Sequence, residues 1–78
     1  MSIFPNPASD LIFIKNENET PIQSIRLINI LGQEVLQKSV NENGLVELKV
    51  NKISEGIYFL EIQLEGFKVT RKIEISHL

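Results

Sequence analysis

The stretch IYFLEIQLEGFKVTRKIEI, from Ile57 to Ile75, carries the pattern that decides the fold. Alternate side chains are apolar in two successive runs, with Arg71 as the one exception. The apolar side chains are Tyr58, Leu60, Ile62 and Leu64 in the first run and Phe67, Val69, Ile73 and Ile75 in the second. Because successive side chains of a β-strand point to opposite faces, each run predicts a half-buried strand. Only Glu65 and Gly66 separate the two runs, so the stretch predicts a tight antiparallel hairpin. Arg71 falls on the apolar face, and we expect it to reach the rim or a carboxylate.

The rest of the chain repeats this rhythm of short aliphatic runs ended by Gly, Asn, Pro or Ser. It predicts seven strands, near residues 2–4, 11–15, 24–30, 34–39, 45–50, 57–64 and 67–75. Gly32 marks a second hairpin, because glycine adopts the positive φ that such turns need, and the NENG stretch (Asn41–Gly44) predicts a polar loop. The prediction is an all-β fold: a small Ig-like antiparallel β-sandwich of about seven short strands, forming one domain over residues 1–78.

Two early runs, LIFI and SIRLINIL, place apolar side chains on both faces of their strands. Such strands are either central and covered, or they leave an apolar surface for a partner.

Composition narrows the class of function. The chain has 78 residues, no cysteine and a net charge of −2 with both signs scattered. Disulfides and thiolate metal sites are therefore excluded, and the sequence has no basic field for nucleic acid. No apolar run approaches the roughly 20 residues of a membrane-spanning helix. The N-terminus also lacks signal-peptide character, so we expect any information for crossing an inner membrane to lie elsewhere.

Groups that carry catalysis or bind metals are sparse. The single histidine, His77, lies in what the sequence predicts to be a frayed tail, so a triad with Ser9 and Asp10 is disfavoured. The polar stretch from Asn16 to Glu19 offers oxygen ligands for calcium, but its spacing matches no calcium loop. A solvated turn is the preferred interpretation there. We expect no catalytic residue, no metal site and no cofactor, and hence no enzyme.

The opening stretch FPNPASD, Phe4–Asp10, is rich in turn-forming residues. Pro5 and Pro7 fix φ and remove two main-chain donors. Asn6 and Asp10 have short side chains that bond to neighbouring amides. Alone, the stretch predicts an extended arm that crosses from one sheet to the other.

Together with three later blocks, this stretch points to a known family. PNPASD resembles the opening of the C-terminal sorting domain of the type 9 secretion system of Bacteroidetes. IRLINILGQEV (Ile25–Val35), ISEGIYFLEI (Ile53–Ile62) and VTRKIEI (Val69–Ile75) are similar to the later segments of that family, in the same order. Phe4 stands where tyrosine is frequent, a mild departure.

The resemblance implies a sorting signal at the C-terminal end of a larger secreted protein, and no catalyst. Its expected partners are an outer-membrane shuttle, a surface sortase and the covalently attached cargo. Its expected location is the periplasm in transit, then the cell surface or the medium. The matching motif residues, which are the candidate recognition site, are Pro5, Asn6, Pro7, Asp10, Gly56, Tyr58 and Lys72.

Two of these residues also have ordinary structural interpretations, and a third does not. Gly56 allows the turn into the sixth strand, and Tyr58 is a core residue with its hydroxyl at the rim. Lys72 points outward, which favours a role in recognition.

The final hairpin is the expected docking edge. Residues 67–78 hold three positive charges and one negative, and strand addition to an open sheet edge is a common mode of recognition. Exposed edges also make a homodimer of the isolated domain plausible.

Two other interpretations stay open at this point. One is a passive Ig-like surface or adhesion module, since fold does not imply function. The other is a carbohydrate-binding module, which is disfavoured because the chain has only five aromatic residues and no tryptophan.

Overall fold

The computed structural model describes residues 1–42 and 44–77, and it contains all seven predicted strands. They are β1 (Ser2–Phe4), β2 (Leu11–Asn16), β3 (Ile22–Asn29), β4 (Glu34–Glu42), β5 (Gly44–Lys49), β6 (Gly56–Leu64) and β7 (Phe67–Ile75). No described residue lies in a helix, so this part of the chain also lacks any helix long and apolar enough to cross a membrane. The predicted all-β class is confirmed.

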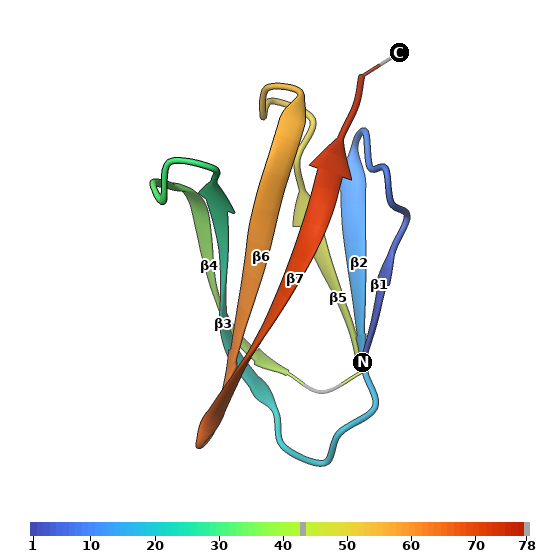
Figure 1. Ribbon diagram of the computed structural model, residues 1–78. Helices are drawn as coiled ribbons and strands as arrows, with labels where there is room; N and C mark the ends of the chain where they lie inside the picture. Colours follow the sequence, from blue (N-terminus) through green and yellow to red (C-terminus); the bar gives the residue numbers. More distant parts are fainter. Residues whose placement is uncertain (43, 78) are drawn as a thin grey trace.

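The strands form two sheets that face each other (Figure 1). The smaller sheet has the order β1-β2-β5, and the larger has the order β4-β3-β6-β7. Every neighbouring pair is antiparallel. The predicted β-sandwich is therefore confirmed, with β1 and β5 at the edges of one sheet and β4 and β7 at the edges of the other.

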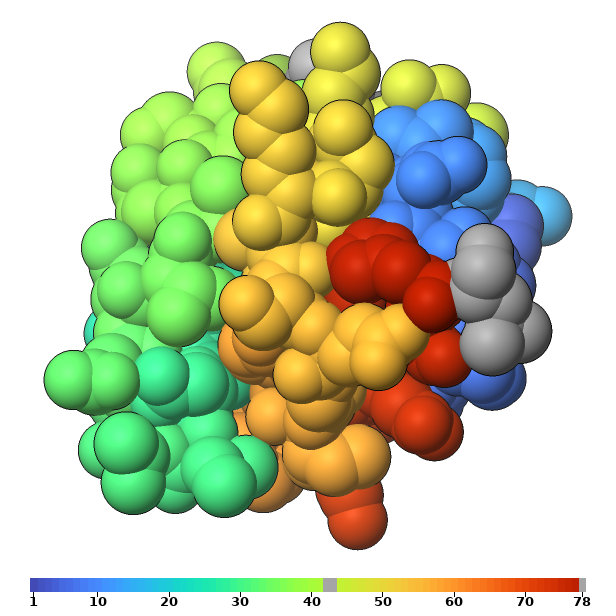
Figure 2. Space-filling model, turned by 90° about the horizontal axis from the view of Figure 1, so that it is seen from above, coloured from blue at the N-terminus to red at the C-terminus, as the bar shows by residue number. Residues whose placement is uncertain are grey.

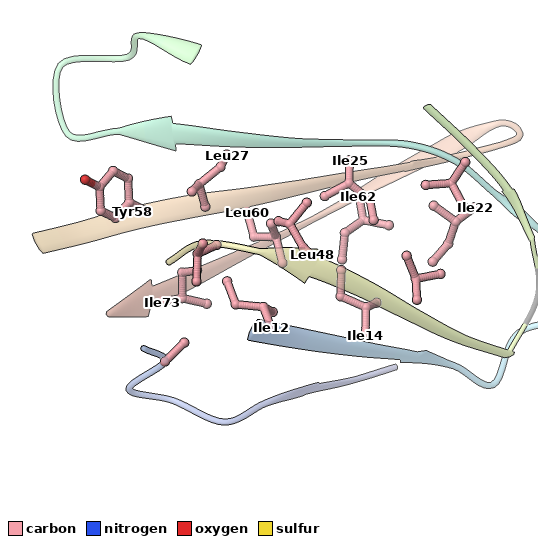
Figure 3. Close-up of a cluster of buried hydrophobic side chains, with 14 of the residues drawn as sticks. Ile12, Ile14, Ile22, Ile25, Leu27, Leu48, Tyr58, Leu60, Ile62 and Ile73 are labelled. Carbon is pink, nitrogen blue, oxygen red and sulfur yellow. The ribbon is translucent and has the colours of Figure 1, made fainter. Parts of the chain in front are cut away.

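Side chains from both sheets meet between them and form one apolar core (Figure 3). The alternation predicted for β5 and β6 is observed, because the apolar residues of each strand that share a face are buried. The fully buried large side chains are Ile12, Ile14, Ile22, Ile25, Leu27, Val50, Leu60, Ile62, Leu64 and Ile75. Without a disulfide, this burial is the main source of stability that the chain offers.

The turn from β3 to β4 is held by Asn29. Its Oδ1 accepts hydrogen bonds from the amides of Leu31 and Gln33, each at 3.0 Å. Gly32 adopts a φ of 83°, a conformation that costs other residues energy because of their Cβ atom. The predicted hairpin at Gly32 is confirmed.

The connection from β4 to β5 differs from the predicted loop at Asn41–Gly44. Strand β4 continues through Glu42, which pairs with Ile22 of β3, and β5 begins at Gly44. The prediction was wrong for Asn41 and Glu42, because a strand edge pairs through its main chain whatever the polarity of its side chains. Asn43 lies outside the described residues.

Strand β7 is buried over only part of its length. Ile73 and Ile75 are buried as predicted, whereas Val69 is half-buried and Phe67 is 45% exposed. Figure 1 shows the first part of β7 extending beyond the smaller sheet, and Val69 there packs only partly against the core. The side chain of Arg71 is also exposed, and its Nη1 donates to the Thr70 carbonyl at 3.1 Å instead of to a carboxylate.

Candidate recognition site

Segments that lie far apart in the sequence meet at one end of the sandwich. The connection from β1 to β2, the connection from β5 to β6 and the residues after β7 all lie at this end (Figure 1). Seen from above, the last described residues lie between the N-terminal segment and the segment that leads into β6 (Figure 2). The topology therefore gathers the predicted motif segments around the end of β7.

Ala8 is the centre of this arrangement. Its amide donates to the Glu74 carbonyl, and its carbonyl accepts from the Ser76 amide, both at 2.9 Å. These two bonds form a parallel bridge between Ala8 and Ile75. The side chain of Ala8 is buried in the core, so a larger side chain has little room there. The N-terminal segment thus lies along the outer edge of β7.

Asn6 extends the same contact. Its side-chain Oδ1 accepts a hydrogen bond from the Glu74 amide at 3.0 Å. We call the segment from Asn6 to Ala8 the clasp, because it satisfies three main-chain groups of Glu74 and Ser76. The predicted crossing arm is observed, but its main partner is the terminal strand.

The remaining residues of the first motif surround the clasp. Pro5 and Pro7 are exposed, and their peptide bonds to Phe4 and Asn6 are cis. The carbonyl of Asp10 accepts from the Val50 amide at 2.8 Å, which ties the start of β2 to the end of the β5 segment. The side chain of Asp10 is exposed and faces a shallow hollow shared with Ser76 and His77.

Gly56 and Tyr58 hold the other side of β7. Gly56 pairs with Ile75, so Ile75 lies between Gly56 of β6 and Ala8 of the clasp. The φ of Gly56 is 154°, which other residues adopt only with strain. Tyr58 is buried, and its hydroxyl donates to the Ser54 carbonyl at 2.6 Å. Both structural interpretations made from the sequence are therefore confirmed.

Lys72 lies apart from this cluster of contacts. It is exposed on the outer face of the larger sheet, opposite Phe59 of β6. It forms no ion pair with any other residue that the structure describes. Its outward orientation was predicted, and it lies beside the exposed Phe59 in the register of β6 and β7.

The C-terminal segment is held in place, which corrects the prediction of a frayed tail. The His77 amide donates to Glu55 Oε1 at 2.7 Å, and its ring Nε2 lies 2.6 Å from the Ile53 carbonyl. Because a carbonyl oxygen only accepts, Nε2 carries the proton and is the donor. Ser9, Asp10 and His77 do line one hollow, yet the proton on Nε2 prevents that nitrogen from acting as a base toward Ser9.

The polar loop after β2 is organised by an asparagine. Asn16 is buried; its Nδ2 donates to the Thr20 carbonyl, and its Oδ1 accepts from the Asn18 amide. The loop is thus a hydrogen-bonded turn whose first residue faces inward, and not a wholly solvated turn. Among residues 1–42 and 44–77, no group of three or more His, Asp or Glu side chains is arranged to hold a metal ion.

Two features of this end were not predicted. The first is the pairing of Ala8 in the clasp with Glu74 of β7. Neither a small residue nor an exposed charged residue gives a pattern signal for such pairing. The second is a set of exposed apolar side chains at the same end, Ile30 and Leu31 in a turn and Ile57 and Phe59 on the outer face of β6. In the sequence, the only indication of this exposed apolar surface was the presence of apolar residues on both faces of the early strands.

The comparisons with known proteins agree with this picture. A family model described as the secretion system C-terminal sorting domain matches residues 2–76. No curated protein matches the chain. The matched range includes the clasp, the β6 motif and the whole of β7.

Proposed function

The chain belongs to the family of secretion system C-terminal sorting domains, and we propose that it is the non-catalytic C-terminal signal of a larger secreted protein. Domains of this family mark attached cargo for export across the outer membrane by the type 9 system. The observation that carries the proposal is the family match over nearly the whole chain. The meeting of its first and second motifs at the end of β7 supports it, because segments far apart in the sequence then lie together at one end of the fold.

In this proposal the cargo first reaches the periplasm by a separate signal. An outer-membrane shuttle then binds the sorting domain, and a surface sortase removes it, so the cargo ends on the cell surface or in the medium. The recognition residues are Pro5, Asn6, Pro7, Asp10, Gly56, Tyr58 and Lys72, in two groups. Pro5, Pro7, Asp10 and Lys72 are exposed and contact the partner, whereas Asn6, Gly56 and Tyr58 fix the end of β7 in position.

Export of a reporter tests the function. A reporter protein with its own N-terminal signal peptide is fused ahead of the domain and produced in a bacterium that has a type 9 system. We expect the reporter outside the cell, and in the periplasm of a strain that lacks the translocon. A folded fusion that stays in the periplasm of both strains would refute the proposed function.

Lys72→Glu tests the site without disturbing the fold, because the side chain is exposed. We expect export to fall while the melting temperature stays unchanged. Lys49→Glu makes the same charge change on β5 of the smaller sheet, also at an exposed position, and export should persist. Equal export by the two variants would remove Lys72 from the site. Deletion of residues 67–78 is a poor test, because it removes Ile73 and Ile75 from the core.

We also propose that copies of the isolated domain associate at high concentration. Open sheet edges favour pairing between copies, so we expect weak, reversible dimers. Sedimentation at increasing dilution checks this, since the dimers should dissociate.

A further inference from the structure

The outer edge of β7 is satisfied at its end and open at its beginning. In a strand, the N–H and C=O groups of alternate residues point to the same side. Those of Glu74 point outward, because they bond to Ala8 and Asn6 of the clasp. The main-chain groups of Lys68, Thr70 and Lys72 therefore point outward as well. No strand among the described residues pairs with this side of β7.

The other sheet edges are less suited to a new strand. β1 is only three residues long. The edges of β4 and β5 lie on the same side of the sandwich, where Lys38 of β4 donates from Nζ to the Glu47 carbonyl of β5 at 2.9 Å. A short edge and an edge covered by a lysine are both known ways of blocking strand addition. Among the described strands, the segment from Lys68 to Lys72 is an edge that no side chain from another strand covers.

The side chains around this segment define what it can bind. Lys68, Arg71 and Lys72 are positive, and residues 67–73 contain no acidic residue. Lys68 Nζ is 3.8 Å from Glu61, whereas Arg71 and Lys72 form no ion pair within the described part of the chain. The surface potential at this edge thus favours an acidic partner.

The two faces of the segment differ. Lys68, Thr70 and Lys72 lie on the outer face. Phe67 and Val69 lie on the inner face, where Phe67 is exposed and Val69 is half-buried against the core. A strand added here would place alternate side chains over each face. Acidic side chains would meet the lysines, and apolar ones would cover Phe67 and Val69. In the free protein, Arg71 Nη1 occupies the outward carbonyl of Thr70, where an incoming N–H would replace it.

We propose that the edge of β7 from Lys68 to Lys72 binds an extended segment of a partner protein with alternating acidic and apolar residues, added as a fifth strand beside β7. This inference rests on the proposed function, because that function places the partner protein in the export machinery. The clasp fixes where the added strand ends, because Glu74 is already bonded. Affinity comes from the main-chain bonds, and the alternating side chains provide specificity.

Binding of a short synthetic peptide of alternating glutamate and valine to the isotope-labelled domain tests this directly. We expect saturable shifts of the amide NMR signals of Lys68, Thr70 and Lys72, which weaken as salt rises because exposed charges are screened. A peptide of alternating lysine and valine is the control and should cause no such shifts. Saturable shifts centred on β1, β4 or β5, equal binding of both peptides, or no binding would each overturn the proposal.

Thr70→Pro blocks the edge while keeping the hairpin. The Thr70 N–H points away from β6, so proline removes a bond to the partner and none to β6. We expect about tenfold weaker binding, which corresponds to one lost hydrogen bond of about 1.4 kcal/mol. Thr70→Val retains the N–H and the branched shape, and it should bind like the unmodified domain. Equal binding by the proline and valine variants would refute strand addition.

The same variants separate this inference from the proposed function. If the unmodified fusion is exported and Thr70→Pro is exported equally well, the edge proposal fails and the sorting function stands. If the unmodified fusion is not exported, the proposed function fails whatever the peptide does. Loss of export in Thr70→Pro alone, with an unchanged melting temperature, is the outcome that we expect.

Discussion

The two parts of β7 share one alternation in the sequence and yet have opposite surroundings. Over Ile73–Ile75 the strand is buried on its inner face and bonded on both edges, to Gly56 and Tyr58 of β6 and to the clasp. Over Phe67–Lys72 its inner face is largely exposed and its outer edge is open. Apolar alternation therefore predicts a strand, whereas burial of that strand also requires a second layer opposite it.

The two parts of β7 also have different structural roles. The clasped part anchors β7 to the sandwich, and the open part presents main-chain groups and positive charge. The motif residues follow the same division, because Asn6, Gly56 and Tyr58 belong to the anchor and Lys72 belongs to the presented part. Substitutions in the two parts should therefore differ in kind as well as in size.

The largest effect is expected for Ile75→Ala in the clasped part. Ile75 is 1% exposed, and removing a buried isoleucine side chain to alanine costs about 2–5 kcal/mol. Urea unfolding measures the loss in the free energy of unfolding. A loss no larger than that of a surface substitution would contradict the difference between the two parts of β7, since it would mean that the end of β7 is not anchored.

Gly56→Ala should have the next largest effect. A Cβ would meet only Tyr58 Cε1 at 3.8 Å, an ordinary contact, so the cost arises from the φ of 154°. Strain of this kind costs about 1–3 kcal/mol. Thermal melting of Gly56→Ala beside Ser54→Ala, an exposed neighbour in the same turn, isolates the backbone effect. Equal melting temperatures would contradict it.

Asn6→Ala should have a smaller effect, of about 0.5–1.5 kcal/mol, because it removes one hydrogen bond. Hydrogen exchange gives the sharper measurement. In the unmodified domain the Glu74 amide should exchange more slowly than the outward-facing Thr70 amide. In Asn6→Ala the Glu74 amide should exchange about as fast as Thr70, while Asn51→Ala, at an exposed position of the same end, leaves it protected. Unchanged protection would show that the clasp does not depend on Asn6.

The smallest effect is expected for Phe67→Ala, the counterpart of Ile75→Ala in the open part. Phe67 lies on the same face of β7 but is 45% exposed, so the cost should be about 0.5 kcal/mol or less. The same urea measurement provides the comparison. If Phe67→Ala were as destabilising as Ile75→Ala, the beginning of β7 would be covered in solution, and the open edge would have to be reconsidered.

Much of this fold follows from local pattern. The alternation in Ile57–Leu64 and the two-residue turn at Glu65 and Gly66 were sufficient to predict the β6–β7 hairpin, and the other strands were located to within a few residues. The extent of β4 was missed at Asn41 and Glu42, because main-chain pairing with β3 depends on the partner strand and not on side-chain polarity.

The site was less predictable. Lys72, Gly56 and Tyr58 have the orientations that alternation and turn chemistry predict. The clasp was missed because it joins Asn6 and Glu74, which are 68 positions apart in the chain, and local patterns carry no information on such pairing. The hold on His77 was missed for the same reason, since Glu55 and Ile53 are remote from it in sequence.

The contact between Asn6 and Glu74 has a consequence for the timing of assembly. The first motif of the chain acquires its partner only when β7 is present, and closing so long a loop brings no benefit until both ends are in place. A cargo protein whose synthesis stops before β7 would have an unfinished core and no clasp. The first motif would therefore take up its folded arrangement only in a chain that includes β7.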